Sequence, residues 1–274
     1  MTSTNAQTKG ESSFEIGVVE GSRHFESAQT SGVRIVLVHG SMDRQNSFLK
    51  LAKILARHHE VLTYDRRGYA TSAHLAGPFD LERHVIDLGD VIGSRPSIVV
   101  GHSFGGTVAL KFAQDHPDLV LGTVVYENPM PWLDWWPRDT GAGMAARRID
   151  EPERAAEEFL VRFIGQRLWD RLPEATKQAR RAEGRALVAE LSSIRMRPGF
   201  DRDRVSSPVM VGVGTRAKEY LRAGATFLAE GSDARLVVLE AAHHNAHSAH
   251  PNEFAEQLVE PLITRVRQGR WENL

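Results

Sequence analysis

The sequence contains no cysteine and no long apolar run. The first absence excludes disulfide bonds and zinc–thiolate sites. The second argues against a transmembrane helix, which needs roughly 20 consecutive apolar residues. The opening stretch, MTSTNAQTKGESS, also lacks the apolar segment of a signal peptide. We therefore expect a cytoplasmic protein that does not bind membranes, with a disordered tail over residues 1–13.

The chain also has little net charge, because 34 basic and 35 acidic residues leave a formal charge of −1 over 274 residues. A protein that neutralises nucleic-acid phosphates needs an excess of Lys and Arg, so this balance argues against a nucleic-acid partner. The hydrophobic content of 41% is enough for a sizeable core, and the length suits one large domain with a modest insertion. A small-molecule substrate is the expected partner, and a homodimer is compatible with these features.

Eight short β-rich runs are separated by stretches with helical periodicity. Six of the runs are almost entirely apolar, which is typical of parallel strands buried on both faces. The first two alternate more and carry charge, as an antiparallel edge pair does. This order predicts the α/β class, with a doubly wound, mostly parallel sheet of eight strands. The predicted strands are 14–19, 24–28, 33–39, 60–64, 97–100, 121–126, 208–213 and 236–239.

The segment 128–204 interrupts this alternation, because it contains no convincing strand. It begins with PMPWLDWWPRDTGAG and continues as charged, Ala-rich sequence that predicts helices over 152–164 and 173–194, with the arginines on solvated faces. We expect a helical cap, inserted after the sixth strand of a core made of residues 14–127 and 205–274. A cap at this place lies over the carboxyl edge of the sheet, where open α/β sheets bind ligands.

A serine stands between glycines where a predicted strand gives way to a helix, in the stretch GHSFGG. A sharp strand–turn–helix connection exposes a hydroxyl above the sheet but crowds the backbone around it. Gly101 and Gly105, two positions before and after Ser103, remove the Cβ atoms that would clash. Ser103 is therefore the candidate nucleophile. The alternative is a glycine-rich turn in which the serine only caps the helix.

Four stretches together resemble the α/β-hydrolase superfamily, and the resemblance covers nearly the whole chain. VLVHGSMD looks like the oxyanion loop of the family, and TYDRRGYATS looks like its Asp-x-Arg-Gly loop. GHSFGG looks like the nucleophile elbow, and LEAAHHNAHSAHPNEF looks like the late histidine loop that leads to a Pro-x-x-Phe helix. The resemblance implies a serine hydrolase with a helical cap, and it implies no metal, flavin or nicotinamide cofactor.

The late loop offers four histidines as the general base: His243, His244, His247 and His250. In the family pattern the catalytic histidine lies seven residues before the proline of Pro-x-x-Phe, and counting back from Pro251 selects His244. His243 stands where the family usually has glycine, which is a departure from the pattern. A metal site is the alternative, but the loop has no His-Glu-x-x-His pattern and no carboxylate of ligand spacing nearby.

The acid of a triad must orient the imidazole and stabilise its cation. Ala217 occupies the position after the seventh strand where the family often has Asp. A second family position, at the end of the sixth strand, holds Glu127, and we assign the acid there. Some haloalkane dehalogenases place their acid similarly, but Ser103 removes their chemistry, which needs a carboxylate nucleophile. Glu219 and then Asp233 are the alternatives, as is a Glu127 that only forms a salt bridge at the hinge of the cap.

A tetrahedral intermediate needs two backbone N–H donors. By position the resemblance assigns them to Phe104, the residue after the nucleophile, and to Ser41, with Met42 as the one-residue alternative. Above the site we expect the aromatic walls of a small apolar pocket, and packing between cap and core is the alternative for each of them. These wall residues are Trp132, Trp135 and Trp136.

Together these assignments predict a carboxylic ester hydrolase with a Ser-His-Glu triad, which cleaves a small apolar ester or lactone through an acyl-enzyme on Ser103. Thioester or C–C bond hydrolysis would use the same residues. Two alternatives of another class are a ligand-binding protein of the same fold and a lyase or isomerase that uses His244 only as a base, because fold does not fix function.

Overall fold

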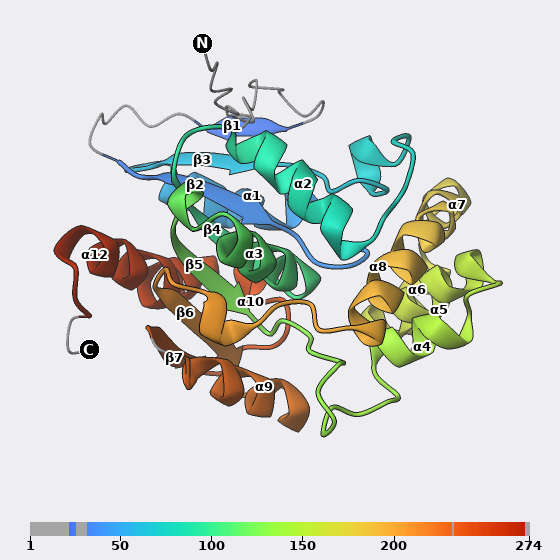
Figure 1. Cartoon of the computed structure of the whole chain (residues 1–274). Helices are drawn as coiled ribbons and strands as arrows, with labels where there is room; N and C mark the ends of the chain where they lie inside the picture. Colours follow the sequence, from blue (N-terminus) through green and yellow to red (C-terminus); the bar gives the residue numbers. More distant parts are fainter. Residues whose placement is uncertain (1–21, 26–31, 232, 272–274) are drawn as a thin grey trace, which may run out of the picture.

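The computed structural model describes residues 22–25, 32–231 and 233–271, and within them one sheet runs through the molecule (Figure 1). Its strand order is β1-β3-β2-β4-β5-β6-β7. Strand β1 is antiparallel to β3, and every other pair is parallel, which confirms the predicted doubly wound, mostly parallel sheet. The strands are β1 (Arg23–Phe25), β2 (Arg34–Val38), β3 (Glu60–Thr63), β4 (Ser97–His102), β5 (Val120–Tyr126), β6 (Val209–Gly214) and β7 (Ala234–Leu239).

The sheet shows seven described strands where the sequence predicts eight. The predicted strand 14–19 and the predicted tail 1–13 both lie outside the described residues. Strand β1 overlaps the predicted run 24–28 and lies at an antiparallel edge, as expected.

Helices cover both faces of the sheet because its central strands are apolar on both sides. Val36 and Val38 of β2 join a core with α2, α3 and α9, whereas Ile35 and Leu37 join a second core with α1, α11 and α12 (Figure 1). These helices are α1 (Leu49–Leu55), α2 (Leu81–Ile92), α3 (Phe104–Asp115), α9 (Glu219–Ala229), α10 (Ala246–Ala249), α11 (Pro251–Phe254) and α12 (Glu260–Gln268). Of the described helices, none is both long and apolar enough to cross a membrane.

Five further helices lie between β5 and β6, beside the sheet (Figure 1), and we call them the cap helices. The predicted helix 173–194 is two helices, because the chain turns at Gly184, where a Cβ would lie 1.8 Å from the carbonyl oxygen of Pro152. The limits 128–204 for a cap domain stay a prediction. The cap helices are α4 (Gly141–Arg147), α5 (Pro152–Ile164), α6 (Gln166–Asp170), α7 (Glu174–Ala182) and α8 (Gly184–Met196).

Candidate active site

Ser103 occupies a strained turn between β4 and α3, with φ 51° and ψ −126°. A non-glycine residue adopts such a backbone conformation only where its surroundings hold it there. The surrounding glycines make this possible, because a Cβ on Gly101 would lie 2.4 Å from the oxygen of Gly105, and one on Gly105 would lie 2.2 Å from the oxygen of Val38. The backbone N–H of Ser103 donates to the oxygen of Tyr126 at 2.9 Å. The turn is therefore fixed, and the serine itself stays partly exposed.

His244 and Glu127 form the shortest polar link of the site, with 2.7 Å between Nδ1 and Oε2. The Glu127 side chain is fully buried, and its other oxygen accepts the N–H of Gly214 at 3.1 Å. A carboxylate only accepts, so Nδ1 of His244 carries the proton and Nε2 is left with a lone pair. Glu127 has a φ of 48° at the end of β5, which makes it a second strained residue of the site.

Two hydrogen bonds hold the histidine loop against the elbow. The Nε2 of His102 donates to the carbonyl of His244 at 2.8 Å, and the hydroxyl of Tyr126 donates to the carbonyl of His243 at 3.0 Å. The rings of His102 and His244 lie 4.6 Å apart. The residues that precede Ser103 and Glu127 in the sequence therefore fix the backbone of the loop that carries His244.

The alternative bases and acids lie in other surroundings. His243 is exposed, with its Nε2 3.3 Å from a guanidinium nitrogen of Arg216, and Glu219 is exposed at the start of α9. Asp233 accepts from Arg265 at 2.6 Å and from the indole of Trp271 at 2.7 Å. Of the candidates from the sequence, the structure therefore brings together His244 and Glu127 at the elbow of Ser103.

The loop after β2 lies directly against the elbow. A Cβ on Gly40 would lie 2.9 Å from the Cβ of Ser103, so glycine allows this approach. Ser41 and Met42 follow, and Met42 has a φ of 54°. Phe104 begins α3, so its N–H has no carbonyl within the helix to bond. Both predicted donor segments of the oxyanion hole thus flank the serine.

His39 braces this loop through two hydrogen bonds. Its Nε2 accepts the N–H of Arg66 at 2.8 Å, so Nδ1 carries the proton and donates to the oxygen of Gly40, also at 2.8 Å. Burial and the nearby Arg66 charge lower the pKa of His39 to about 4. Asp65 is structural too, since it accepts from Gln45 and Thr71.

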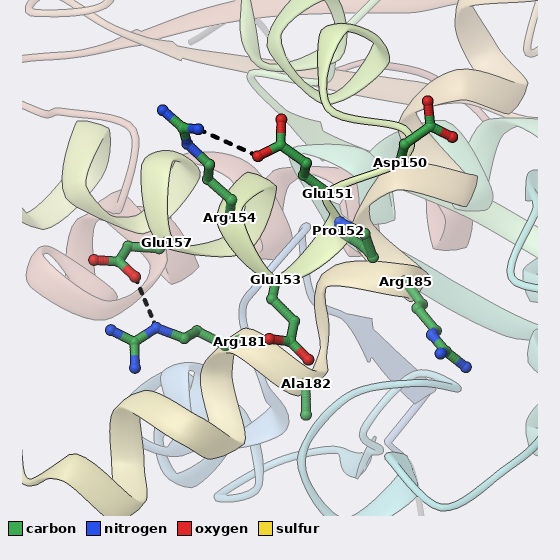
Figure 2. Close-up of a pocket in the computed structure, with 9 residues that line it drawn as sticks. All are labelled: Asp150, Glu151, Pro152, Glu153, Arg154, Glu157, Arg181, Ala182 and Arg185. Carbon is green, nitrogen blue, oxygen red and sulfur yellow. Dashed lines mark hydrogen bonds and ion pairs between the residues drawn. The ribbon is translucent and has the colours of Figure 1, made fainter.

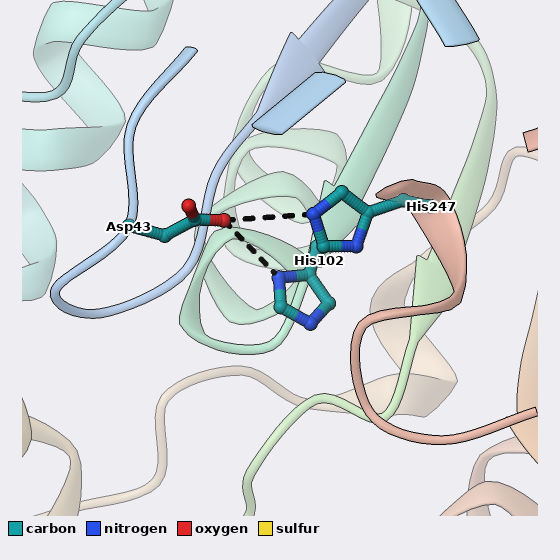
Figure 3. A group of neighbouring side chains, drawn as sticks. All are labelled: Asp43, His102 and His247. Atoms are coloured by element: carbon teal, nitrogen blue, oxygen red, sulfur yellow. Dashed lines mark ion pairs between the residues drawn. The ribbon is translucent and has the colours of Figure 1, made fainter. Parts of the chain in front are cut away.

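Asp43, His102 and His247 form the group whose ligand atoms could reach one metal ion (Figure 3). The carboxylate oxygen lies 3.8 Å from Nδ1 of His102 and 3.6 Å from Nε2 of His247. The two rings are tilted by 38° with their centres 4.1 Å apart, and both nitrogens face the same carboxylate oxygen (Figure 3). The expectation that the protein binds no metal stays a prediction. Although burial opposes it, the two imidazoles hold the pKa of Asp43 well below its usual range, and burial lowers that of His102 to about 3. The group links the oxyanion loop to the histidine loop.

The three predicted wall tryptophans make their described ring contacts with other aromatic side chains. Trp132 packs edge-on against Phe200 at 5.3 Å, and Trp136 against Tyr220 of α9 at 5.0 Å. Trp135 is 46% exposed. The contact of Trp132 with Phe200 lies within residues 128–204, whereas that of Trp136 reaches α9 of the core. The role of the tryptophans as pocket walls stays a prediction.

Phe163, which the sequence analysis missed, is the cap residue beside the triad. Its ring lies 5.6 Å from that of His244, and the side chain is 52% exposed at the end of α5. The ring is a large exposed apolar surface next to the candidate base.

Two hollows of the structure lie on the cap side. The larger, about 560 Å³, lies between the start of α5 and the end of α7 and is lined mostly by charged side chains (Figure 2). The smaller, about 200 Å³, includes Trp132 and Trp136 in its lining. Neither lining includes Ser103, His244 or Glu127.

Charged residues that the sequence did not single out connect the cap helices to the core. Arg66 and Glu190 of α8 form a fully buried ion pair at 2.7 Å. Arg180 of α7, expected on a solvated face, is 11% exposed and donates to the oxygen of Met42. That expectation was wrong for Arg180, because the partner that buries it belongs to a loop more than a hundred residues away in the sequence. One signal was available: Glu190 shares its helix face with Leu187, Leu191 and Ile194.

The chain is similar in sequence to proteins of a known family. The pattern of the Alpha/beta hydrolase family matches residues 35–257. RutD of Caulobacter vibrioides, to which carbamate hydrolysis is provisionally assigned, is 32% identical over 128 residues, or 43% of this chain and 47% of that protein. A fluoroacetate dehalogenase from a Burkholderia species is 30% identical over 105 residues, or 35% and 34% of the two chains. The chain thus matches less than half of the length of these curated relatives.

The fold also matches solved structures over most of its length. The enol-lactonase from Burkholderia xenovorans LB400 superposes with a TM-score of 0.69 at 21% identity, and covers 89% of this chain and 95% of its own. At this identity the likeness shows the fold.

Replacing Gly40 with alanine is expected to lower kcat for a short ester by about a hundred-fold. The added Cβ pushes against Ser103, and about an ångström of misplacement can cost that much. Steady-state kinetics with a nitrophenyl ester measures the loss, and circular dichroism checks the fold. A Gly40→Ala enzyme with wild-type kcat would show that the two loops are not tightly packed.

We expect the free energy of unfolding to fall on acidification, because burial lowers the pKa of His39 in the folded protein. Its pKa is about 4 in the folded protein and about 6.5 in the unfolded chain, so the unfolded state binds more protons between these values. The contribution of neutral His39 to the free energy of unfolding is complete above pH 6.5 and is lost as the pH falls toward 4. The full pKa shift corresponds to a loss of roughly 3 kcal/mol. Urea unfolding at pH 7 and about pH 4.5 should show that His39→Gln loses less stability than the wild type. Equal losses in the two proteins would contradict this account.

Proposed function

The chain belongs to the α/β hydrolase family, and we propose that it is a serine hydrolase whose nucleophile, base and acid are Ser103, His244 and Glu127. The observation that carries the proposal is the 2.7 Å bond between His244 and Glu127, two residues 117 positions apart in the sequence. The bond forms beside a serine held in a strained turn by close glycine contacts. Strain of this kind concentrates at functional positions.

In the proposed acylation, Oγ of Ser103 attacks the carbonyl carbon of the substrate, and Nε2 of His244 takes the hydroxyl proton. Glu127 stays ionised and stabilises the imidazolium through Nδ1–H. The negative charge that develops on the carbonyl oxygen is met by the N–H of Phe104 and of Ser41, or of Met42. His244 then returns the proton to the leaving alcohol as the tetrahedral intermediate collapses to the acyl-enzyme.

Deacylation repeats these steps with water. His244 takes a proton from the water, whose oxygen attacks the acyl carbon, and the proton passes to Oγ of Ser103 as the carboxylic acid leaves. Each step uses only the three side chains and backbone donors, so the cycle closes without a cofactor.

The proposed substrate is a small carboxylic ester or lactone with an apolar acyl part. Support comes from the surroundings of the triad, where the ring of Phe163 lies beside His244 and the side chains of Met42 and Phe104 are buried next to the elbow. The dehalogenase among the relatives suggests another chemistry, but Ser103 stands where that reaction needs a carboxylate nucleophile. Hydrolysis of a thioester or a C–C bond would use the same residues.

Ser103→Ala is expected to abolish ester hydrolysis, with a loss of about a million-fold in kcat. A nitrophenyl ester of short acyl chain measures turnover, and a fluorophosphonate probe should label the wild type alone. The fold should persist, because alanine removes only a partly exposed hydroxyl. Retention of a tenth of the activity would exclude Ser103 as the nucleophile, and a wild type that resists the probe would favour a ligand-binding protein.

Glu127→Gln is expected to lower kcat by about ten-thousand-fold, as a comparable change does in another triad. The amide keeps the shape of the carboxylate but removes its charge and can favour the wrong tautomer of His244. Glu219→Gln, at an exposed acid of α9, is the matched control and should keep wild-type kcat. If Glu127→Gln were fully active, the acid would have to lie elsewhere.

A further inference from the structure

Three carbonyl groups of the oxyanion loop accept hydrogen bonds from guanidinium groups. Arg66 donates from Nε to the oxygen of His39 at 2.8 Å and from Nη2 to that of Gly40 at 3.0 Å. Arg180 of the cap helix α7 donates to the oxygen of Met42. The carbonyl directions of this loop are therefore set by two charged side chains.

Fixing a carbonyl also fixes the N–H of the same peptide. The Gly40–Ser41 peptide is trans, so its N–H points opposite to its carbonyl. That carbonyl is held from one side by Arg66 and by Nδ1–H of His39. Ser103 lies close to Gly40, with 2.9 Å between its Cβ and the site of a Cβ on Gly40. Arg66 thus determines which way the N–H of Ser41 points next to the nucleophile.

Arg66 is itself held by a carboxylate of the cap. Glu190 of α8 pairs with it at 2.7 Å, and both side chains are fully buried. The second oxygen of Glu190 accepts the hydroxyl of Tyr69 at 2.7 Å. Although burial alone would raise it, the Arg66 charge holds the pKa of Glu190 at about 2. The guanidinium also lies 4.9 Å from the ring centre of Phe104, the other predicted donor residue.

We propose that Glu190 is a positioning residue for the oxyanion hole: it orients Arg66, and Arg66 turns the Gly40–Ser41 peptide so that its N–H faces the reacting carbonyl oxygen. This inference rests on the proposed function. In this proposal the oxyanion hole forms only when helix α8 packs against the core.

The proposal predicts a specific kinetic signature. Oxyanion donors act on charge that develops in the transition state, so a displaced donor lowers kcat and leaves KM nearly unchanged. Removal of one such donor costs about a hundred-fold or more in kcat. A displaced donor is expected to cost at least ten-fold. A residue that only stabilises the fold would instead lower the melting temperature without this effect on kcat.

The test compares Glu190→Gln with Asp87→Asn. Asp87 pairs with Arg67, the neighbour of Arg66, at 2.8 Å, but the described contacts of Arg67 are with Asp87 and Ala76 rather than with the oxyanion loop. For a short nitrophenyl ester, Glu190→Gln should lose at least ten-fold in kcat with KM within two-fold of wild type. Its affinity for butylboronic acid, which forms a tetrahedral adduct with a nucleophilic serine, should fall by a similar factor. Asp87→Asn should keep both values.

A second variant keeps the test valid if Glu190→Gln does not fold. Arg66→Lys retains a buried cation for Glu190 but lacks the fork that reaches two carbonyls, and the same loss of kcat and boronate affinity is expected. Wild-type kcat in a folded Glu190→Gln or Arg66→Lys would overturn the proposal, as would an equal loss in Asp87→Asn. An inactive Ser103→Ala beside a fully active Glu190→Gln would reject this inference alone, whereas an active Ser103→Ala would reject the proposed function.

Discussion

The close approach of three backbone segments around Ser103 is the constraint on which the site depends. The elbow, the loop after β2 and the segment after β5 meet at distances that leave no space for a Cβ at Gly40, Gly105 or Gly106. This contact forces Ser103 into a left-handed conformation and lifts its hydroxyl above the sheet. The sheet makes the contact possible, because parallel strands β2, β4 and β5 are neighbours and end at the same edge.

Charged and polar side chains around Ser103 fix the directions in which the hydrogen-bond donors of the site point. Glu127 fixes the tautomer of His244 from beneath, and His39 is kept neutral by burial so that it can both accept and donate. Arg66 carries a buried charge that is compensated by Glu190 and by the carbonyls of His39 and Gly40. The interior of the molecule thus contains several ionic groups whose positions matter more for orientation than for net stability.

The sequence predicts most of the fold, because buried strands and the glycines of the elbow leave strong local patterns. The helix over 152–164 is found with the predicted limits. Local patterns fail where partners are distant in the sequence. Arg180 lies on the charged helix α7, which reads as solvated, and its packing on the loop after β2 buries it. Glu190 lies among apolar residues of α8, and its partner Arg66 belongs to the loop after β3. The assignment of Trp132, Trp135 and Trp136 to a pocket wall stays a prediction, because aromatic residues line pockets and also pack one segment of a protein against another.

The central claim is that Ser103 forms an acyl-enzyme, and trapping that species tests it most directly. The wild-type enzyme would be mixed with a nitrophenyl ester, quenched in acid within milliseconds and digested for mass spectrometry. The account predicts that the peptide containing Ser103 gains the mass of the acyl group, and that the adduct accumulates together with a burst of nitrophenol. Turnover of the ester with the acyl group on another residue, or a burst without any covalent adduct, would contradict it.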